Sequence, residues 1–567
     1  MVRVRKGEKD FYLSFKFVVS LFTLLRLIYS RFEFAAILTI CSFLASGGYE
    51  VANNYSGTII GDFYMALIDA DEKYFWTLVW KATLIYFGQT LLLAISSLIT
   101  WLLYISMRKN LVTALHKMYF RRNAYYQLNS VDNAGIDNPL VSFRDQRITQ
   151  DVERFCSTLT NNIFPYILIF PGVIGYYTYK TWVTAGPFGV GIVYLYFLAG
   201  VIANRLIVSP LTKWTARVEK AEGNFRFKHV SVRNNAEESA FYGAAEFDES
   251  ECNRSFTILM KKQFWSAIWR FPPQFLQNFF DYYGGVMSYL IQVFPVFIFH
   301  SYKDMDPGTL SKQISNNAFF FIYLINSFTR LTDLALSVGE MAGYSQRISE
   351  MVNYLQDVSD DNTNYYNCAE GSEQSQELLI TENLSFSSPS DPRSDLVTGL
   401  NLVIPKNKTL LITGSSGVGK TSFLRVLKKL WEPRAGMILR RFNQKNSMFL
   451  PQRPYFPTGW LSIRQQILFP RLEEDMPCVD MENERILNIL RTLRLTPLIP
   501  ICGGLTEPTN FEWQDTLSPG EQQRLSIARV LFHKPPYVFM DESTSSLSVE
   551  DEAIVYNSLK EVISLRM

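Results

Sequence analysis

The sequence predicts a multi-domain membrane protein in which a helical membrane domain precedes an α/β nucleotide-binding domain. Two observations predict this order. Apolar stretches long enough to cross a bilayer recur before residue 340, and a glycine-rich phosphate-loop motif occupies Gly414 to Thr421. The 567 residues are enough for two or three domains. Hydrophobic residues make up 48% of the chain, a value expected for the average of an apolar membrane domain and a water-soluble domain.

The composition excludes several other classes of function. The net charge of +2 gives no support to binding a polyanion, so no nucleic-acid partner is expected. The six cysteines show neither C-x-x-C pairs nor regular spacing. Neither a zinc site nor a disulfide scaffold is therefore indicated.

Residues 1–32 are expected to form a cytosolic segment with an amphipathic helix. The first ten residues are basic, and the apolar stretch from Phe11 to Tyr29 carries Lys16 and Arg26. No small-residue cleavage pattern accompanies it. A helix lying on the membrane lipid therefore fits this stretch better than a cleaved signal peptide.

Residues 33–340 are expected to form a six-helix transmembrane domain. Six apolar stretches are long enough to span, and several exceed the roughly 20 residues that a bilayer requires. Their approximate ranges are 33–52, 74–106, 160–181, 184–207, 273–299 and 316–338.

The distribution of basic residues predicts the orientation of these spans. The segment from Arg108 to Arg154 holds eight Lys and Arg, whereas Val51 to Lys73 holds one. The positive-inside rule then places the N-terminus and the 108–157 loop in the cytosol. Six spans return the chain to the cytosol near residue 340, where an ATPase domain must lie. The sequon at Asn54 falls on the other side, close to the first span, and its glycosylation stays open.

Ionisable residues within or near the spans are Lys81, Asp281, Arg330 and Asp333. Charges at membrane depth are costly and often functional, so one interpretation is contact with a transported substrate. The alternative is that Arg330 and Asp333, three apart on one helix face, simply pair with each other.

Two charged excursions, about 108–157 and 208–266, interrupt the spans. They are expected to carry short helices that transmit movements of the ATPase domain, with Asn235 to Tyr242 as a candidate. The alternative is a solvated helix with no special role. Residues 341–377 are expected to be a linker, because the polar stretch Asp357 to Gln376 has no apolar period.

Residues 378–567 are expected to form the nucleotide-binding domain. The run Thr409 to Thr413 predicts a short strand that leads into the phosphate loop. In such a loop, glycines allow backbone N–H groups to surround phosphates, a lysine reaches the β- and γ-phosphates, and a hydroxyl binds Mg²⁺. The expected nucleotide-binding residues here are Gly414, Ser415, Gly417, Gly419, Lys420, Thr421 and Ser422.

Three further motifs follow the phosphate loop in the sequence. Gln452 lies in a loop where it could contact Mg²⁺ and the attacking water. The apolar run Tyr537 to Met540 predicts a buried strand that ends in Asp541 and Glu542. The aspartate is expected to hold Mg²⁺ with Thr421 and Gln452, while Glu542 polarises the nucleophilic water with help from Gln452.

The remaining motif, LSPGEQQRL at 517–525, lies between these two in the sequence. It places Ser518, Gly520 and Glu521 at a helix N-terminus, where they can bind a phosphate. This order and spacing indicate an ATP-binding cassette, with ATP and Mg²⁺ as cofactors. A degenerate fold that binds nucleotide without hydrolysis is the alternative.

The chain resembles half-size ABC transporters of subfamily D, and within that group the lysosomal branch that exports cobalamin. The stretches that carry the resemblance are 116–129, 145–155, 225–242, 316–325, 342–348, 410–427, 450–456 and 517–529. The resemblance implies an exporter-type membrane domain, ATP hydrolysis coupled to transport, and movement of cobalamin from the lysosomal lumen to the cytosol. It also implies a multi-pass protein of the lysosomal membrane, with the endoplasmic reticulum or peroxisomal membrane as alternatives, and an escort protein as a further partner.

The resemblance implies a dimer as well. The phosphate loop and the signature of one subunit cannot clamp the same nucleotide, so Ser518 and Gly520 are expected to close over ATP bound by a partner. The partner is a second copy or a related half-transporter.

One departure from the family pattern concerns the end of the chain. Cassettes place a switch histidine beyond the catalytic glutamate, and no histidine follows His533 here. The nucleotide-binding domain is therefore expected to be C-terminally truncated, with ATP binding retained and slow turnover, because such a donor contributes about 10²–10³ in rate. Two alternatives stay open: a peroxisomal fatty acyl-CoA transporter, and a truncated isoform that regulates full-length partners.

Overall fold

The computed structural model divides the chain into two compact units. Unit 1 comprises Met1–Ala124 and Ala134–Ser359, and unit 2 comprises Tyr125–Asn133 and Asp360–Met567. The residues that the structure describes are 15–29, 34–128, 147–167, 169–300, 302–303, 305–361, 376–389, 391–406, 408–443, 446–473 and 479–564.

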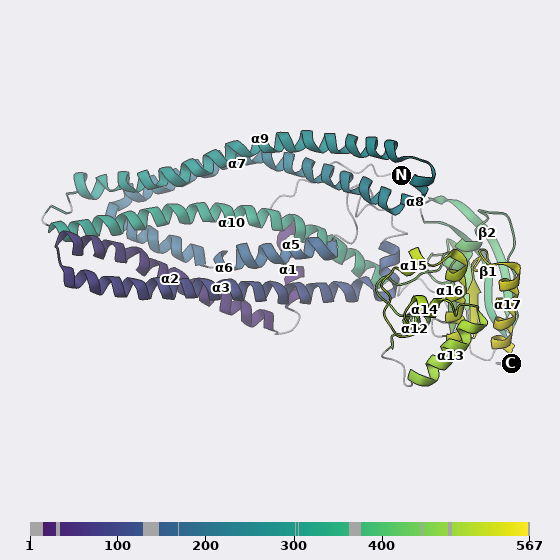
Figure 1. The fold of residues 1–567 in the computed structure, drawn as a ribbon. Helices are drawn as coiled ribbons and strands as arrows, with labels where there is room; N and C mark the ends of the chain where they lie inside the picture. The colour runs from purple at the N-terminus through teal and green to yellow at the C-terminus, as the bar shows by residue number, and fades with distance from the viewer. Residues whose placement is uncertain are drawn as a thin grey trace. The chain divides into compact units, whose positions relative to one another are not determined.

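Unit 1 is built from long helices (Figure 1). Helix α2 packs on α3, and α7 packs on α9. Intact helices satisfy their own backbone hydrogen bonds, which is the requirement for crossing lipid. The helices are α1 (Phe15–Ile28), α2 (Phe34–Ile68), α3 (Glu72–Tyr119), α5 (Val152–Thr158), α6 (Phe164–Ile167), α7 (Ile169–Asn234), α8 (Ala236–Phe241), α9 (Ala245–Ile291) and α10 (Pro307–Asp361). The short helix α4 (Ala124–Tyr126) begins in unit 1, and its residues Tyr125 and Tyr126 belong to unit 2.

Four segments are long and apolar enough to cross a membrane in the part of the chain that the structure describes, where the sequence predicts six spans. They are Phe34–Ile68, Glu72–Tyr119, Arg147–Ala203 and Pro307–Asp357. The third contains the expected span 160–181 and most of the expected span 184–207. The expected span 273–299 is not among them, because glutamine, asparagine and tyrosine side chains lower its mean hydropathy. The prediction of six is therefore not confirmed by length and hydropathy.

Helix α7 is two helical segments that meet at Gly186. The backbone there has φ of 69°, outside the helical region, which glycine tolerates because it has no Cβ. Across this point the hydroxyls of Thr178 and Tyr194 lie 3.1 Å apart. Sixteen residues of straight helix would separate them by about 24 Å. The chain therefore doubles back at Gly186.

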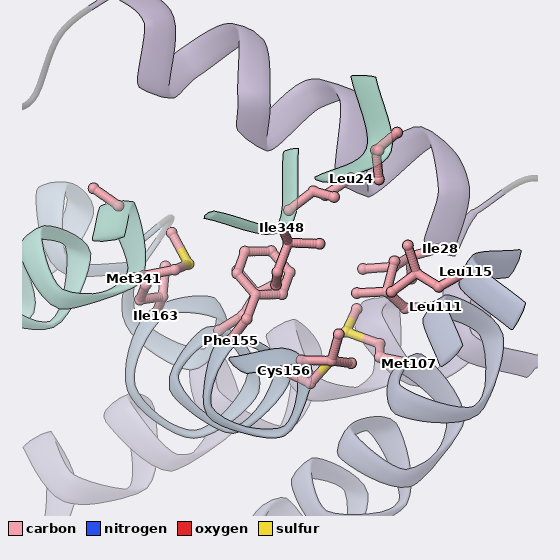
Figure 2. Close-up of a cluster of buried hydrophobic side chains, with 14 of the residues drawn as sticks. Leu24, Ile28, Met107, Leu111, Leu115, Phe155, Cys156, Ile163, Met341 and Ile348 are labelled. Carbon is pink, nitrogen blue, oxygen red and sulfur yellow. The ribbon is translucent and has the colours of Figure 1, made fainter. Parts of the chain in front are cut away.

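Helix α1 packs against other helices of unit 1 through one face (Figure 2). Leu24 and Ile28 are buried in a cluster with side chains of α3, α5 and α10, whereas Phe22 on the other face is 67% exposed. The expected amphipathic helix is thus present, but it does not simply lie on a membrane. One apolar face of the helix packs against the protein core, and the face that bears Phe22 remains exposed.

Helix α10 extends through the start of the expected linker. Met341, Ile348 and Leu355 are buried in the same cluster, so the helix is packed from 341 to 355. Residues 362–375 of the expected linker lie outside the described residues.

Unit 2 contains two sheets and several helices. An antiparallel sheet has the strand order β2–β1–β3, from β1 (Glu377–Ser388), β2 (Asp391–Pro405) and β3 (Ala435–Arg440). A parallel pair joins β4 (Ser447–Leu450) to β5 (Tyr537–Met540), with Leu450 opposite Met540. The helices are α11 (Lys420–Leu427), α12 (Ile463–Leu468), α13 (Val479–Thr492), α14 (Leu498–Ile501), α15 (Trp513–Thr516), α16 (Pro519–His533) and α17 (Val549–Ser564).

The strand expected at Thr409 to Thr413 is not formed. These residues carry no ladder hydrogen bonds of a strand, and Leu411 is 81% exposed. The two strands beside the site, β4 and β5, pair with each other instead. An apolar run predicts that a strand is favourable but does not determine its partner.

Candidate nucleotide-binding site

The phosphate loop of unit 2 leads directly into helix α11. Gly417 and Gly419 have φ of 84° and 103°, conformations that a side chain would strain. Lys420 begins α11, and its Nζ donates to the carbonyl oxygens of Gly414 at 2.6 Å and Ser415 at 3.0 Å. The ammonium group therefore lies within the loop, at a helix N-terminus whose free N–H groups attract anions.

The parallel pair of strands brings the other expected residues to one edge. Because β4 and β5 run in the same direction and in register, the residues that follow them emerge together. The Asp541 N–H donates to the Leu450 carbonyl at 3.0 Å, which fixes the end of this ladder. Gln452 follows β4, and Asp541 and Glu542 follow β5.

Two hydrogen bonds connect these groups. Thr421 Oγ1 donates to Asp541 Oδ1 at 3.2 Å, and Gln452 Nε2 donates to Glu542 Oε2 at 2.8 Å. Glu542 has φ of 46°, a left-handed conformation that is uncommon outside glycine and often marks a functional position. Residues from three separate motifs therefore meet at one place.

The arrangement suits Mg²⁺ and a nucleotide. A hydroxyl oxygen, a carboxylate oxygen and an amide are ligands that Mg²⁺ accepts, and Thr421 and Asp541 already lie within hydrogen-bonding distance. The adjacent loop supplies backbone N–H groups and Lys420 for phosphates. The same residues that hydrogen-bond each other can therefore turn their oxygens to a metal ion.

The signature residues cap helix α16. Ser518 is the N-cap, and its Oγ donates to Glu521 Oε2 at 2.7 Å and accepts from the Glu521 N–H at 3.4 Å. This reciprocal capping box fixes the helix start. A methyl group at Gly520 would lie 3.1 Å from the carbonyl oxygen of Ser546, a tight contact that would require this backbone to shift by a few tenths of an ångström. The side-chain hydrogen bonds that the structure describes for Ser518 and Glu521 join these two residues to each other.

A further link joins α16 to the segment after Glu542. Gln523 Nε2 donates to Ser545 Oγ at 3.1 Å, and Gln523 Oε1 accepts from the Ser546 N–H at 2.9 Å. The helix that bears the signature is thus tied to the carboxylate strand within one chain. Sequence reasoning did not identify this link.

Arg529 is a second residue that sequence reasoning missed. It lies on α16 and is 5% exposed. Its guanidinium donates to the carbonyls of Gln466 at 2.8 Å and Tyr455 at 2.7 Å, and to Gln466 Oε1 at 3.1 Å. The rings of Phe456 and Phe469 lie 4.9 and 4.8 Å from it. Burial lowers the pKa of Arg529 to about 10, so it stays charged at neutral pH. Arg529 therefore binds the signature helix to the segment that follows Gln452.

Two family profiles match the chain. The profile described as ABC transporter transmembrane region 2 matches residues 28–297, and the profile described as ABC transporter matches residues 397–545. The first lies within unit 1 apart from residues 125–133, and the second lies within unit 2. The order of a membrane region followed by an ATPase domain agrees with the geometry described above.

Several characterised proteins are similar over most of the chain. The lysosomal cobalamin transporter ABCD4 of Homo sapiens is 36% identical, covering 88% of this chain and 83% of that protein. The lysosomal cobalamin transporter ABCD4 of Mus musculus is 38% identical, covering 80% and 76%. The ABC transporter D family member 1 of Dictyostelium discoideum is 26% identical, covering 99% and 87%. This extent of similarity, across both the membrane region and the ATPase domain, shows that the chain belongs to subfamily D of the ABC half-transporters.

Proposed function

We propose that this protein is an ATP-driven half-transporter that works as a dimer and moves cobalamin from the lysosomal lumen to the cytosol. The observation that carries the proposal is the meeting of Thr421 with Asp541 and of Gln452 with Glu542 beside Lys420. The 36–38% identity to two lysosomal cobalamin transporters supports the substrate and the lysosomal membrane.

The side chains at the site have distinct roles in this proposal. Lys420 and the N–H groups of the loop hold the phosphates, and Thr421 and Asp541 hold Mg²⁺, with Gln452 beside them. Bound Mg²⁺ supplies neutralisation of the charge on the transferred phosphate. Glu542 accepts a hydrogen bond from the attacking water and orients it, and the amide of Gln452 positions the Glu542 carboxylate.

Dimerisation is part of the proposed mechanism. Ser518 and Gly520 lie at the N-terminus of α16, which favours an anion. The phosphate loop has its own set of partners at the ends of β4 and β5. We assign the signature residues to ATP held by a second copy, so that nucleotide binding joins two copies and hydrolysis releases them.

We propose that the membrane domain has six spans. The reversal at Gly186 divides the Arg147–Ala203 segment into two crossings. The apolar end of α9 supplies another crossing, although its mean hydropathy is low. With α2, α3 and α10, these make six.

Contacts within unit 2 support a route between ATP and the membrane helices. Trp431 Nε1 donates to the hydroxyl of Tyr126 at 3.1 Å, and the Arg425 guanidinium lies 4.9 Å from the Trp431 ring. Arg425 is on α11, the helix that begins at Lys420. Tyr126 follows the end of α3 by seven residues, so the chain itself connects this contact to a spanning helix. The excursion after α3 is therefore proposed to transmit nucleotide binding.

The second excursion has an exposed apolar tip. Phe241 and Tyr242 end α8, at the turn between α7 and α9, and are 83% and 89% exposed. Exposed aromatic side chains are typical of contact surfaces. We propose that this tip contacts an ATPase domain, as expected for Asn235 to Tyr242.

Transport in proteoliposomes tests the proposal. The full chain is reconstituted with Mg²⁺ and ATP outside, so that the ATPase domains that face outward are active, and uptake or release of radiolabelled cyanocobalamin is measured. We expect ATP-dependent movement that Lys420→Ala abolishes, because the ammonium group that binds phosphate is lost. Equal movement by the wild type and Lys420→Ala would refute ATP-driven transport, and ATP-dependent movement of an acyl-CoA but not of cobalamin would favour the acyl-CoA alternative.

A further inference from the structure

Helices α2 and α10 are joined by two ion pairs at different depths. Lys312 Nζ lies 2.6 Å from Asp62 Oδ1, and Arg330 Nη1 lies 4.0 Å from Glu50 Oε1. The two acids are twelve residues apart on α2, which corresponds to about 18 Å along the helix. Asp62 is six residues from the end of α2 at Ile68. Since the hydrocarbon core is about 30 Å thick, the Glu50–Arg330 pair lies at membrane depth when the Asp62–Lys312 pair lies near the surface.

Two tyrosines surround the deeper pair, Glu50–Arg330. The hydroxyl of Tyr323 donates to Glu50 Oε2, and the Tyr323 ring lies 5.8 Å from the Arg330 guanidinium carbon. The Tyr177 ring of α7 packs on Tyr323 at 4.5 Å, and its hydroxyl donates to Asn54 Oδ1 at 3.3 Å. Three helices, α2, α7 and α10, therefore contribute to one polar cluster.

The two charges of this cluster differ in exposure. The Glu50 side chain is 11% exposed, whereas the Arg330 side chain is 47% exposed. A guanidinium has five N–H donors. In the contacts described for Arg330, the nearest acid is 4.0 Å away, which is longer than a hydrogen bond. Most of its donors are thus available to another molecule.

An exposed arginine at this depth is expected to face water. A charge in contact with hydrocarbon is costly, and charged side chains in spans therefore face the bundle interior or a water-filled cavity. Glu50 offsets the charge of Arg330, and Tyr323 keeps the carboxylate hydrogen-bonded. The cluster can therefore hold the Arg330 guanidinium in position while leaving some of its N–H donors without a hydrogen-bond partner within the cluster.

We propose that Arg330 forms a solute-binding site within the membrane domain, with Glu50 and Tyr323 as positioning residues. The site takes a polar solute that presents amide or phosphodiester oxygens, such as cobalamin, and Arg330 donates to those oxygens. Arginine suits this chemistry because its planar fork donates in pairs to such acceptors. The proposal rests on the proposed transport function and names where that function contacts its substrate.

Equilibrium binding to the full chain in lipid nanodiscs tests the site. The probes are cyanocobalamin and, separately, a long-chain acyl-CoA. We expect Arg330→Gln to weaken cyanocobalamin binding by about tenfold or more, since hydrogen bonds from a charged donor are lost. The matched control is Lys312→Gln, which removes the other α2–α10 cation and is expected to change affinity less than about twofold. ATP binding is measured on every variant and is expected to stay unchanged.

A double variant guards against loss of folding. In Arg330→Gln the buried Glu50 loses its cation, whereas Glu50→Gln with Arg330→Gln leaves a neutral pair that can still accept from Tyr323. The double variant is expected to fold and to bind cyanocobalamin as weakly as the single variant.

The binding results distinguish failure of the proposed site from failure of the proposed transport function. If the wild type binds cyanocobalamin and both Arg330→Gln and the double variant bind it with the same affinity, the proposed site is overturned and the transport function stands. If those variants then differ from the wild type only in a lower unfolding temperature, the Glu50–Arg330 pair serves to stabilise the packing of α2 on α10. Binding of acyl-CoA in place of cyanocobalamin, weakened by Arg330→Gln, would overturn the cobalamin assignment and support the site. Absence of binding of either probe to the wild type would overturn both.

Discussion

Replacing Arg529 by methionine is expected to destabilise unit 2 more than removing an exposed ion pair does. The buried guanidinium donates three hydrogen bonds, to two carbonyls and one side-chain oxygen. Hydrogen bonds to charged groups each contribute roughly 1.5–3 kcal/mol. Burial of the charge offsets part of that sum, so we expect a net loss of roughly 3–5 kcal/mol in the free energy of unfolding.

That loss converts to a measurable temperature. In a domain of 150–250 residues each kcal/mol lowers Tm by roughly 2–4 °C, so Arg529→Met should lower it by roughly 6–20 °C. The assay is differential scanning calorimetry of the full chain in nanodiscs. The transition that moves upward when ATP is added is assigned to unit 2, because a ligand stabilises the part that binds it.

The matched control is Arg434→Met. Arg434 lies 2.7 Å from Asp395, a short ion pair, but its side chain is 54% exposed. Exposed pairs contribute about 0–1 kcal/mol, so a shift of only a few degrees is expected. A shift for Arg529→Met that is equal to or smaller than that for Arg434→Met would refute the claim that the buried contacts join α16 to the segment after Gln452.

Three more predictions concern catalysis, acidity and coupling. Glu542→Gln should retain ATP binding but lower phosphate release by at least about 10²-fold, because the side chain can still pair with Gln452 but cannot act as a base. Burial lowers the pKa of His533 below its usual value, so the folded state holds the imidazole neutral. The free energy of unfolding should therefore fall as the pH drops below about 6.5, by up to about 1.4 kcal/mol per pH unit, because the unfolded chain binds a proton there. Between pH 7.5 and 5.5, Tm should fall less steeply with pH in His533→Gln than in the wild type. Trp431→Phe removes the indole N–H that donates to Tyr126. We expect the rate of ATP hydrolysis to stay within about twofold of the wild type, while the ratio of cobalamin moved to phosphate released falls several-fold. An unchanged ratio would contradict a coupling role for this contact.

The nucleotide site could be expected from the sequence to a large extent. Short motifs specify local backbone chemistry, and the glycines at 417 and 419 have the positive φ that a phosphate loop needs. The pairing of Gln452 with Glu542 required only that two strands run parallel and in register. The catalytic, metal and nucleotide roles of these residues stay predictions.

The rest depended on tertiary packing that no local pattern encodes. Arg330 was identified as an ionisable residue of a span, but its contact with Glu50 joins residues 280 positions apart. The reversal at Gly186 and the low hydropathy of the end of α9 explain why four candidate spans were found where six were expected. Arg529 follows the signature by helix geometry, yet its acceptors come from residues 63 and 74 positions earlier.

The central claim is that two copies bind ATP between them, and inter-chain cross-linking tests it most directly. Two differently tagged chains without native cysteines carry Ser415→Cys and Ser518→Cys respectively, and a short bifunctional thiol reagent is added with and without ATP. We expect a cross-linked heterodimer that requires ATP and is lost when Lys420→Ala is introduced into the first chain. Cross-linking that does not depend on ATP, or that never joins the two chains, would contradict a nucleotide site shared by two copies.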